Sequence, residues 1–260
     1  MRIATWNVNS IRTRVGRVTE WLQKSNVDVL AMQEIKCKPE QFPVAAFEAV
    51  GYQVTLHGLN QWNGVAFAHR IDAEDVEIGF ADMPGFGPEL AQEARAIGAT
   101  FDDVRLWSLY VPNGRALGDP HYDYKLEWLD RLAACAAEWL EADPGLALAL
   151  MGDFNIAPLD TDVWDIHDFA GATHVSAPER QAFEAFEQIG LVDVVRPLVP
   201  QGYTYWDYQQ LRFPRNEGMR IDFILGSDEF AERVESASID RDERKGEGPS
   251  DHVPVAVEIS

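Results

Sequence analysis

The stretch LALALMGDFN, residues 146–155, indicates the class of fold. Its apolar first half is typical of a strand that is buried in a sheet. A carboxylate and an amide, Asp153 and Asn155, follow directly, and the alternation of a strand places them on one face. We therefore expect a buried strand over Leu146–Gly152 whose end carries polar side chains to the edge of a sheet.

Six other short apolar runs predict strands, and the amphipathic stretches between them predict helices. The predicted strands are Ile3–Val8, Val27–Gln33, Gly64–Ala68, Val104–Val111, Ile221–Gly226 and Val253–Ile259. The predicted helices are Val15–Lys24, Lys125–Leu140 and a third after Ser176, whose spacing to Glu179 has the form of a capping box. Because strands and helices alternate without a repeat or a flexible linker, we expect one α/β domain over residues 1–260.

Polar side chains stand at the ends of five of these strands. They are Asn7 with Asn9, Glu34, Asp153 with Asn155, Asp222, and the Ser250-Asp251-His252 segment. Each has an ordinary explanation alone, as a turn residue. Together they form a set of carboxylates and amides without thiolates, which favours Mg²⁺ or Mn²⁺ over zinc. The chemistry that such a set most often supports is phosphoryl transfer.

The charge of the chain argues against binding to nucleic acid. The sequence has 43 acidic and 22 basic residues and a formal net charge of −21, which repels phosphate at long range. The basic residues are nevertheless clustered, at 12–17, 36–38, 212–220 and 241–245. Either these clusters meet in one basic face, or each is a separate solvated patch.

The cysteines and the hydropathy of the chain indicate the cellular compartment that we expect. Cys37 and Cys135 fit no zinc spacing, and we expect buried thiols in a reducing environment. The N-terminus has no apolar signal core, and no segment offers about 18 unbroken apolar residues. We therefore expect a soluble, cytoplasmic protein that does not enter a membrane.

Eight motifs follow one another in an order that resembles the endonuclease/exonuclease/phosphatase superfamily, and within it the exonuclease III branch of AP endonucleases. They are Thr5-Trp6-Asn7-Val8-Asn9-Ser10, Gln33-Glu34, Trp62-Asn63-Gly64-Val65-Ala66, Tyr110-Val111-Pro112-Asn113-Gly114, Gly152-Asp153-Phe154-Asn155, Tyr203-Thr204-Tyr205-Trp206-Asp207-Tyr208, Gly218-Met219-Arg220-Ile221-Asp222 and Ser250-Asp251-His252. The resemblance runs nearly end to end. It implies a four-layer, DNase I-like α/β sandwich, in which two packed mixed β-sheets are flanked by helices.

The resemblance also implies a metal site and a catalytic base. Glu34 would be the main Mg²⁺ ligand, assisted by Asp251 and by Asn7, and Mn²⁺ could substitute for Mg²⁺. Asp153 would orient and deprotonate the attacking water, and Asn155 would fix that water and a phosphate oxygen.

Three further residues would act on the phosphate. His252 would stabilise its charge, and Asp222 would orient His252 and keep it protonated. Tyr110 would contact the phosphate or the leaving oxygen, although packing at a strand end is a fair alternative. Asn9 stands where some relatives have a second metal-binding Asp, which favours a single metal.

For the substrate, the resemblance implies an apolar pocket that admits a flipped deoxyribose without a base. Trp206, Tyr205 and Phe213 would form it, although an aromatic loop packed on a sheet edge would show the same residues. Contacts to DNA phosphates would come from Asn113, Lys36, Arg212, Arg215 and Arg220. Gln209 replaces an Arg of many relatives, which removes one such contact.

The function that the resemblance implies is DNA repair by a monomeric nuclease. It would cleave duplex DNA 5′ to abasic sites, and it would act as a 3′–5′ exonuclease or remove blocking groups from 3′ ends. One alternative is a phosphatase or phosphodiesterase on a small or lipid phosphate ester. The other is a catalytically silent DNA-binding module, which would lack some of the catalytic residues.

Overall fold

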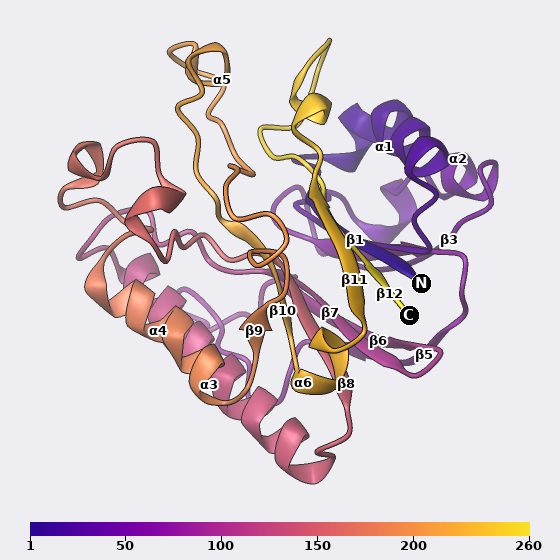
Figure 1. The fold of residues 1–260 in the computed structure, drawn as a ribbon, viewed down its shortest axis with the longest axis horizontal. Helices are drawn as coiled ribbons and strands as arrows, with labels where there is room; N and C mark the ends of the chain where they lie inside the picture. The colour runs from indigo at the N-terminus through magenta and orange to yellow at the C-terminus, as the bar shows by residue number, and fades with distance from the viewer.

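The computed structural model describes all 260 residues, which form two six-stranded sheets packed face to face (Figure 1). The first sheet has the order β11-β12-β1-β2-β4-β3 and the second the order β5-β6-β7-β8-β10-β9. The strands of the first are β1 (Arg2–Asn7), β2 (Val29–Gln33), β3 (Gln53–His57), β4 (Val65–His69), β11 (Val234–Ile239) and β12 (Val255–Ile259). Those of the second are β5 (Ala73–Ile78), β6 (Ala96–Phe101), β7 (Val104–Tyr110), β8 (Ala147–Asp153), β9 (Val192–Asp193) and β10 (Asp222–Gly226).

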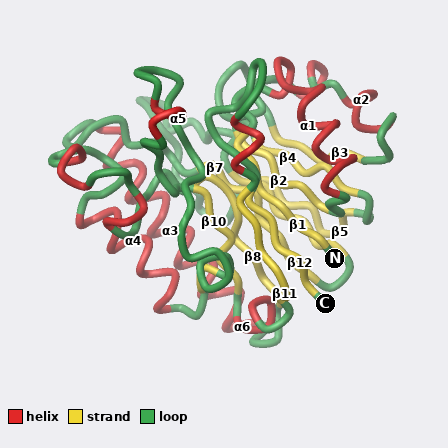
Figure 2. The backbone as a smooth tube through the Cα atoms, turned by 45° about the horizontal axis from the view of Figure 1, so that its top comes forward, coloured by secondary structure: helices red, strands yellow, loops and turns green.

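Helices cover the outer faces of both sheets (Figures 1 and 2). The helices are α1 (Ile11–Ser25), α2 (Val44–Glu48), α3 (Pro120–Ala142), α4 (Ala177–Gln188), α5 (Arg212–Arg215) and α6 (Asp228–Ala231). Helices α1 and α2 pack on the first sheet, and α3 and α4 pack on the second. Short 3₁₀ turns lie at Pro39–Gln41, Asp160–Asp162, Ile166–Phe169 and Arg241–Arg244. The expected four-layer α/β sandwich is therefore confirmed.

Strand β8 shows why its sequence is apolar on both faces. Ala147, Ala149 and Met151 lie in the core between the two sheets, while Leu148 and Leu150 lie in the core beneath α3 and α4. Both faces of the strand are thus covered, and a strand covered on both faces is a continuous apolar run. The small alanines face the other sheet, and the larger leucines fill the space under the helices.

Two parallel strand pairs determine where the polar residues meet. Strands β1 and β2 are parallel and are joined through α1, and β7 and β8 are parallel and are joined through α3. A parallel pair needs such a crossover, and its two strands end at the same edge of the sheet. Asn7 pairs with Gln33 at one such edge, and Tyr110 pairs with Asp153 at the other. The face-to-face packing brings these two edges together.

All seven predicted strands are present, with ends shifted by no more than two residues. Helix α3 begins five residues before its predicted start, because Asp119 caps it by accepting a hydrogen bond from the His121 amide and Pro120 occupies its first turn. Ser176 caps α4 in the predicted capping box. Both cysteines are buried and unbridged, as expected. None of the helices has the length and apolar character that crossing a membrane would require.

Candidate active site

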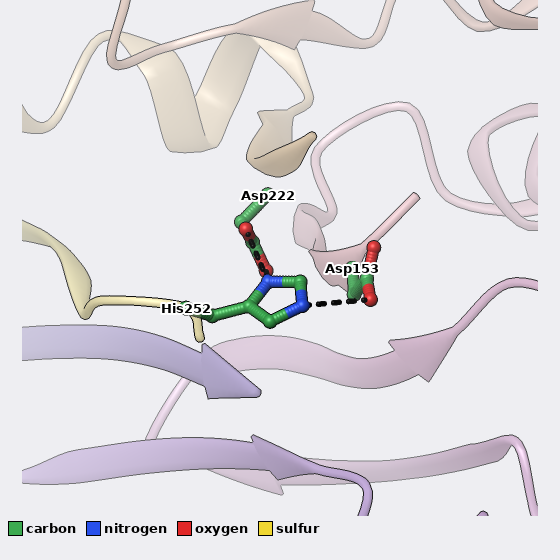
Figure 3. Close-up of side chains that lie close together, drawn as sticks. All are labelled: Asp153, Asp222 and His252. Carbon is green, nitrogen blue, oxygen red and sulfur yellow. Dashed lines mark hydrogen bonds and ion pairs between the residues drawn. The ribbon is translucent and has the colours of Figure 1, made fainter. Parts of the chain in front are cut away.

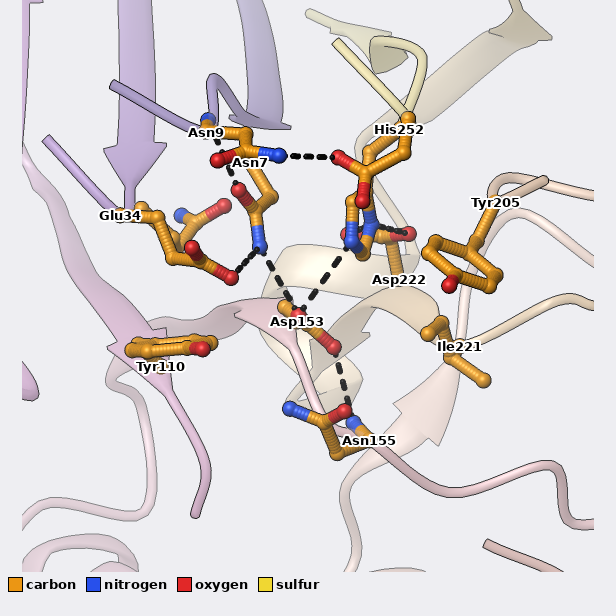
Figure 4. A network of polar contacts seen from close by, with 12 residues as sticks. Asn7, Asn9, Glu34, Tyr110, Asp153, Asn155, Tyr205, Ile221, Asp222 and His252 are labelled. Carbon is orange, nitrogen blue, oxygen red and sulfur yellow. Dashed lines mark hydrogen bonds and ion pairs between the residues drawn. The ribbon is translucent and has the colours of Figure 1, made fainter. Parts of the chain in front are cut away.

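The polar side chains at the strand ends of the two sheets point toward one another (Figure 4). The first sheet contributes Asn7 and Glu34 from the ends of β1 and β2, and the second contributes Tyr110, Asp153 and Asp222 from β7, β8 and β10. Asp251 and His252 come from the loop before β12. That loop is held by a 2.7 Å hydrogen bond from the Ser250 hydroxyl to the Asn7 carbonyl.

Gly152 allows Asp153 to reach this position. It has a φ of 150°, and a Cβ added there would lie 1.9 Å from the carbonyl oxygen of Leu109 on β7. Only glycine therefore fits at this position, the second-last residue of β8. Asp153 then pairs with Tyr110 on β7 and with Asp222 on β10, so that these side chains emerge side by side.

Asn7 connects the two sheets within the site. Its side-chain Nδ2 donates to Glu34 Oε1 and to Asp153 Oδ2, each at 3.0 Å. Its Oδ1 accepts the Asn9 backbone N–H at 3.0 Å. The two carboxylates of opposite sheets are thus held on either side of one amide, and Figure 4 shows them pointing toward it.

Glu34 stands in a charged environment. Lys36 Nζ lies 2.7 Å from Glu34 Oε2 and donates to Asn9 Oδ1 at 2.7 Å. Asn9 Nδ2 in turn donates to Asp251 Oδ1 at 2.9 Å. Burial alone would raise the pKa of Glu34, but Lys36 and the Asn7 amide keep it below its ordinary value. Glu34 is therefore a carboxylate, available to a cation.

Asp153 is bound on its other side by the chain that follows it. Asp153 Oδ1 accepts the Asn155 backbone N–H at 2.9 Å. The Asn155 side chain accepts from Asn113 Nδ2 at 3.0 Å and donates to the Val111 carbonyl at 3.0 Å. Asp153 is 1% exposed, and this burial, despite His252 nearby, raises its pKa. A buried carboxylate with a raised pKa is a stronger base than a free one.

His252 lies between two carboxylates (Figure 3). Its Nδ1 is 2.9 Å from Asp222 Oδ2, and its Nε2 is 3.7 Å from Asp153 Oδ2. Burial opposes a charge on the ring, but Asp222 and Asp153 outweigh burial and raise the pKa of His252 to about 10. The ring is therefore an imidazolium near neutral pH, with Asp222 holding its orientation.

The residues present fit a divalent cation. Asp153, Asp222 and His252 lie close enough together to ligate one, but both nitrogens of the protonated His252 already face carboxylates. The oxygens of Glu34, Asn7 and Asp251 suit a hard cation better. Four carboxylates in the site face only two cationic side chains, and a divalent ion would balance that charge.

Sequence comparison places this geometry in a known family. Residues 4–252 match the Endonuclease/Exonuclease/phosphatase family. The chain belongs to this family. It is 30% identical to the exodeoxyribonuclease III of Haemophilus influenzae, with all of both chains covered.

Solved structures of the family agree closely with the fold. A 3′ phosphatase from Neisseria bound to a product DNA hairpin has a TM-score of 0.92 and 36% sequence identity, covering 100% of this chain and 99% of that one. An AP endonuclease from Archaeoglobus fulgidus has a TM-score of 0.92 and 34% identity, with the same coverage. The resemblance that the eight motifs carry is therefore confirmed.

Within this Endonuclease/Exonuclease/phosphatase fold, the aromatic pocket is lined by other residues than expected. The Tyr205 ring lies 4.9 Å from the His252 ring, tilted by 59°, and lines a pocket of about 300 Å³ with Trp164, Phe169 and Met219. Trp206, expected in that pocket, is 1% exposed and packs 5.2 Å from Phe213. Adjacent residues of an extended segment point in opposite directions. The expectation for Trp206 is therefore corrected: it is a packing residue behind Tyr205.

The residues expected to contact DNA phosphates lie in different surroundings. Arg220 is 2% exposed, donates to the Val199 carbonyl at 2.8 Å and faces Asp193, so its assignment to DNA is wrong. Arg212 and Arg215 both pair with Glu217 in the α5 segment. Asn113 and Lys36 lie inside the site itself, bound to Asn155 and Glu34.

Three residues beside the site were missed by sequence reasoning. His174, with a φ of 78°, lines the same pocket as Tyr205, and burial lowers its pKa to about 3, which leaves it neutral. Lys125 and Glu179 lie buried beneath the site. The Ser176–Glu179 spacing was a signal for Glu179, but the capping box alone accounted for it.

Proposed function

We propose that this protein is a Mg²⁺-dependent DNA repair nuclease that acts as a monomer on duplex DNA. It would hydrolyse phosphoesters 5′ to abasic sites and at 3′ ends, where it removes nucleotides or blocking phosphate groups. The names of its relatives support a nuclease of this kind. The observation that carries the chemistry is the position of Asp153, whose buried carboxylate is held between Asn7, Asn155 and His252.

The metal would be held by Glu34, with Asp251 and Asn7 beside it, and Mn²⁺ could replace Mg²⁺. When bound, the ion neutralises negative charge on the phosphate and polarises a phosphate oxygen. Lys36, at 2.7 Å from Glu34, would be displaced toward the substrate or remain as a second positive charge.

Asp153 would accept the proton of the attacking water. Its Oδ2 faces both the Asn7 amide and His252 Nε2, so a water bound there is oriented from two sides. Asn155 would hold that water through its side-chain amide. The His252 imidazolium would donate to a phosphate oxygen, since its other nitrogen is fixed by Asp222.

Tyr110 would stabilise the leaving oxygen. Burial and the nearby Glu34 raise its pKa well above the ordinary value, so the hydroxyl keeps its proton and can donate a hydrogen bond. Tyr205 would contact the sugar next to the scissile bond, because its ring adjoins His252. Phe213, Asn113, Arg212 and Arg215 remain proposed contacts to the DNA, the two arginines by exchanging Glu217 for phosphate.

The experiment compares three labelled duplexes: one with an abasic-site analogue, one with a recessed 3′-phosphate, and one undamaged. Each is incubated with Mg²⁺, with Mg²⁺ plus excess EDTA, and with the Glu34→Ala protein. Glu141→Gln, which removes an exposed carboxylate on α3, is the matched control. We expect incision or phosphate release with Mg²⁺ only, retained in Glu141→Gln and lost in Glu34→Ala. Hydrolysis that persists in EDTA would reject the metal, and three intact duplexes would reject DNA as the substrate.

A further inference from the structure

A buried ion pair lies beneath the two loops that carry Asn113 and Asn155. Lys125 belongs to α3 and Glu179 to α4, and both side chains are 0% exposed. Neither residue reaches the open side of the site. What they contact is the backbone of the loops that follow β7 and β8.

The Lys125 ammonium uses all three of its N–H groups. It donates to the Asn155 carbonyl at 2.6 Å, to the Asn113 carbonyl at 3.3 Å and to Glu179 Oε1. The side chains of Asn113 and Asn155 are hydrogen-bonded to each other, and the Asn155 N–H donates to Asp153. One cation therefore fixes both loops at the point where they meet Asp153.

Glu179 fixes the next segment of the chain. Its Oε1 accepts the Thr173 hydroxyl at 2.6 Å and the His174 N–H at 2.9 Å, and its Oε2 accepts the Ser176 hydroxyl at 2.6 Å. Thr173 and His174 both line the pocket of Tyr205. The carboxylate thus orders the wall of that pocket, while its charge keeps Lys125 in place.

The packing around the pair leaves little freedom. A Cβ at Gly114, which has a φ of 89°, would lie 2.9 Å from Thr173 Oγ1 and 3.1 Å from Lys125 Cδ. The Asn113–Gly114 turn can therefore sit on the pair only because residue 114 is glycine. The two helices and three loops meet at this single point.

A buried ion pair is a poor source of stability, because well-packed apolar residues of similar size are often as stable or more stable. What this pair contributes is order in the loops, because its hydrogen bonds have fixed directions. We propose that Lys125 and Glu179 are a positioning pair, which holds Asn155 and Asn113 in a fixed position beside Asp153. The effect of the pair on turnover rests on the proposed function; its effect on loop order does not.

The test is the double variant Lys125→Met with Glu179→Leu, which removes both charges together. Arg196→Met with Asp162→Leu removes another ion pair, with side chains 23% and 3% exposed and no hydrogen bond to Asn113 or Asn155, and is the matched control. We expect both proteins to fold, with kcat lowered about tenfold or more in the first alone and KM changed little, because displacing a positioned group by about 1 Å can cost up to 10²-fold. A folded Lys125/Glu179 double variant with wild-type kcat would overturn the proposal.

Hydrogen exchange gives a readout that does not need turnover. In the double variant, amides in residues 111–115 and 153–157 should exchange faster, while strands β1 and β12 keep their protection. Unchanged exchange in both loops would overturn the proposal even if the wild-type protein cleaved no DNA at all. If wild-type DNA cleavage fails while the loops loosen, the proposed function falls and the positioning role stands.

Lys125→Arg provides a second variant that keeps the buried charge paired. The planar guanidinium does not present its donors in the three directions of an ammonium. We expect the protein to fold, with a several-fold lower kcat and faster exchange in the same two loops. Wild-type kcat together with wild-type exchange would count against a role for the direction of these bonds.

Discussion

Asp153 is the residue on which both halves of the site converge. It receives hydrogen bonds from Asn7 of the first sheet and from the Asn155 backbone of the second. Asp153→Asn keeps the size of the side chain and one acceptor oxygen, but it replaces the other acceptor with an NH₂ group and removes the base. We expect kcat to fall on the order of 10²-fold or more, as for the loss of a positioned general base. The measurement is single-turnover cleavage, with the melting temperature as a check on folding; near wild-type cleavage would reject the role of base.

Tyr205 and Trp206 are neighbours in sequence with opposite surroundings, and substitutions should separate them. Trp206 is 1% exposed, so Trp206→Ala should cost about 3–5 kcal/mol of unfolding free energy, the usual loss for a large buried aromatic. Tyr205→Phe should leave stability nearly unchanged, because the ring that packs against His252 remains. Urea denaturation of the two variants is the measurement. Equal losses in both would show that Trp206 is not the packing residue of the pair.

The sequence indicated which residues would gather at the candidate site because they are strand ends, and it failed where side-chain direction is not set by a strand. Asn7, Glu34 and Asp153 follow apolar runs directly, so parallel strands bring them to one edge. Arg220 and Trp206 lie in irregular chain, where nothing in the sequence tells the open side from the packed side. Motif position alone therefore assigned both of them to the substrate.

At the scale of elements, the strands that the sequence did not predict are those with polar or interrupted patterns. Strands β3, β5, β9 and β11 are the four edge strands of the two sheets, and β5 is exposed along most of its length. An edge strand faces solvent on one side and so lacks the apolar run of a central strand. Strand β6 is paired on both sides, but Gly98 interrupts its apolar pattern where the Trp107 ring lies against the strand.

The stability that the Lys125–Glu179 contact between α3 and α4 contributes should depend on pH. Burial alone would raise the pKa of Glu179, but Lys125 and the hydroxyls of Ser176 and Thr173 hold it below its ordinary value. A carboxyl with a lowered folded pKa stabilises the protein above its unfolded pKa, about 4.3, and that stability is lost as the pH falls through the folded value. The melting temperature of the wild type should therefore fall more between neutral pH and pH about 3 than that of Lys125→Met with Glu179→Leu. Parallel pH profiles for the two proteins would contradict this.

At the scale of the whole molecule, most of the cations of this acidic chain are paired with its own carboxylates. Fifteen of the 22 lysines and arginines lie within 4 Å of a carboxylate of the same chain. The basic clusters at 212–220 and 241–245 are largely occupied by such pairs or by stacking on aromatic rings. The four basic clusters nevertheless lie next to one another, because Arg12 donates to the Lys36 carbonyl, Arg17 donates to the Lys245 carbonyl, and Arg241 lies over the Phe213 ring. The clusters therefore meet, but carboxylates of the same chain pair with many of their cations. The cations without a carboxylate partner include Arg12 and Lys38, which line one hollow with the exposed Trp62.

Binding to DNA should consequently depend only moderately on salt. The logarithm of the affinity falls with the logarithm of the salt concentration by about 0.9 for each phosphate neutralised. Arg12, Arg14 and Lys38 are the cations near the site that have no carboxylate partner. If these three act, we expect a slope of about −3, where six to ten phosphate contacts would give about −5 to −9. The measurement is fluorescence anisotropy of a labelled duplex with the Asp153→Asn protein, in which we expect little cleavage, over a series of KCl concentrations. Arg12→Gln and Lys38→Gln should each reduce the slope by about one, whereas a steep slope that neither substitution changes would mean that DNA opens the internal ion pairs and recruits their cations.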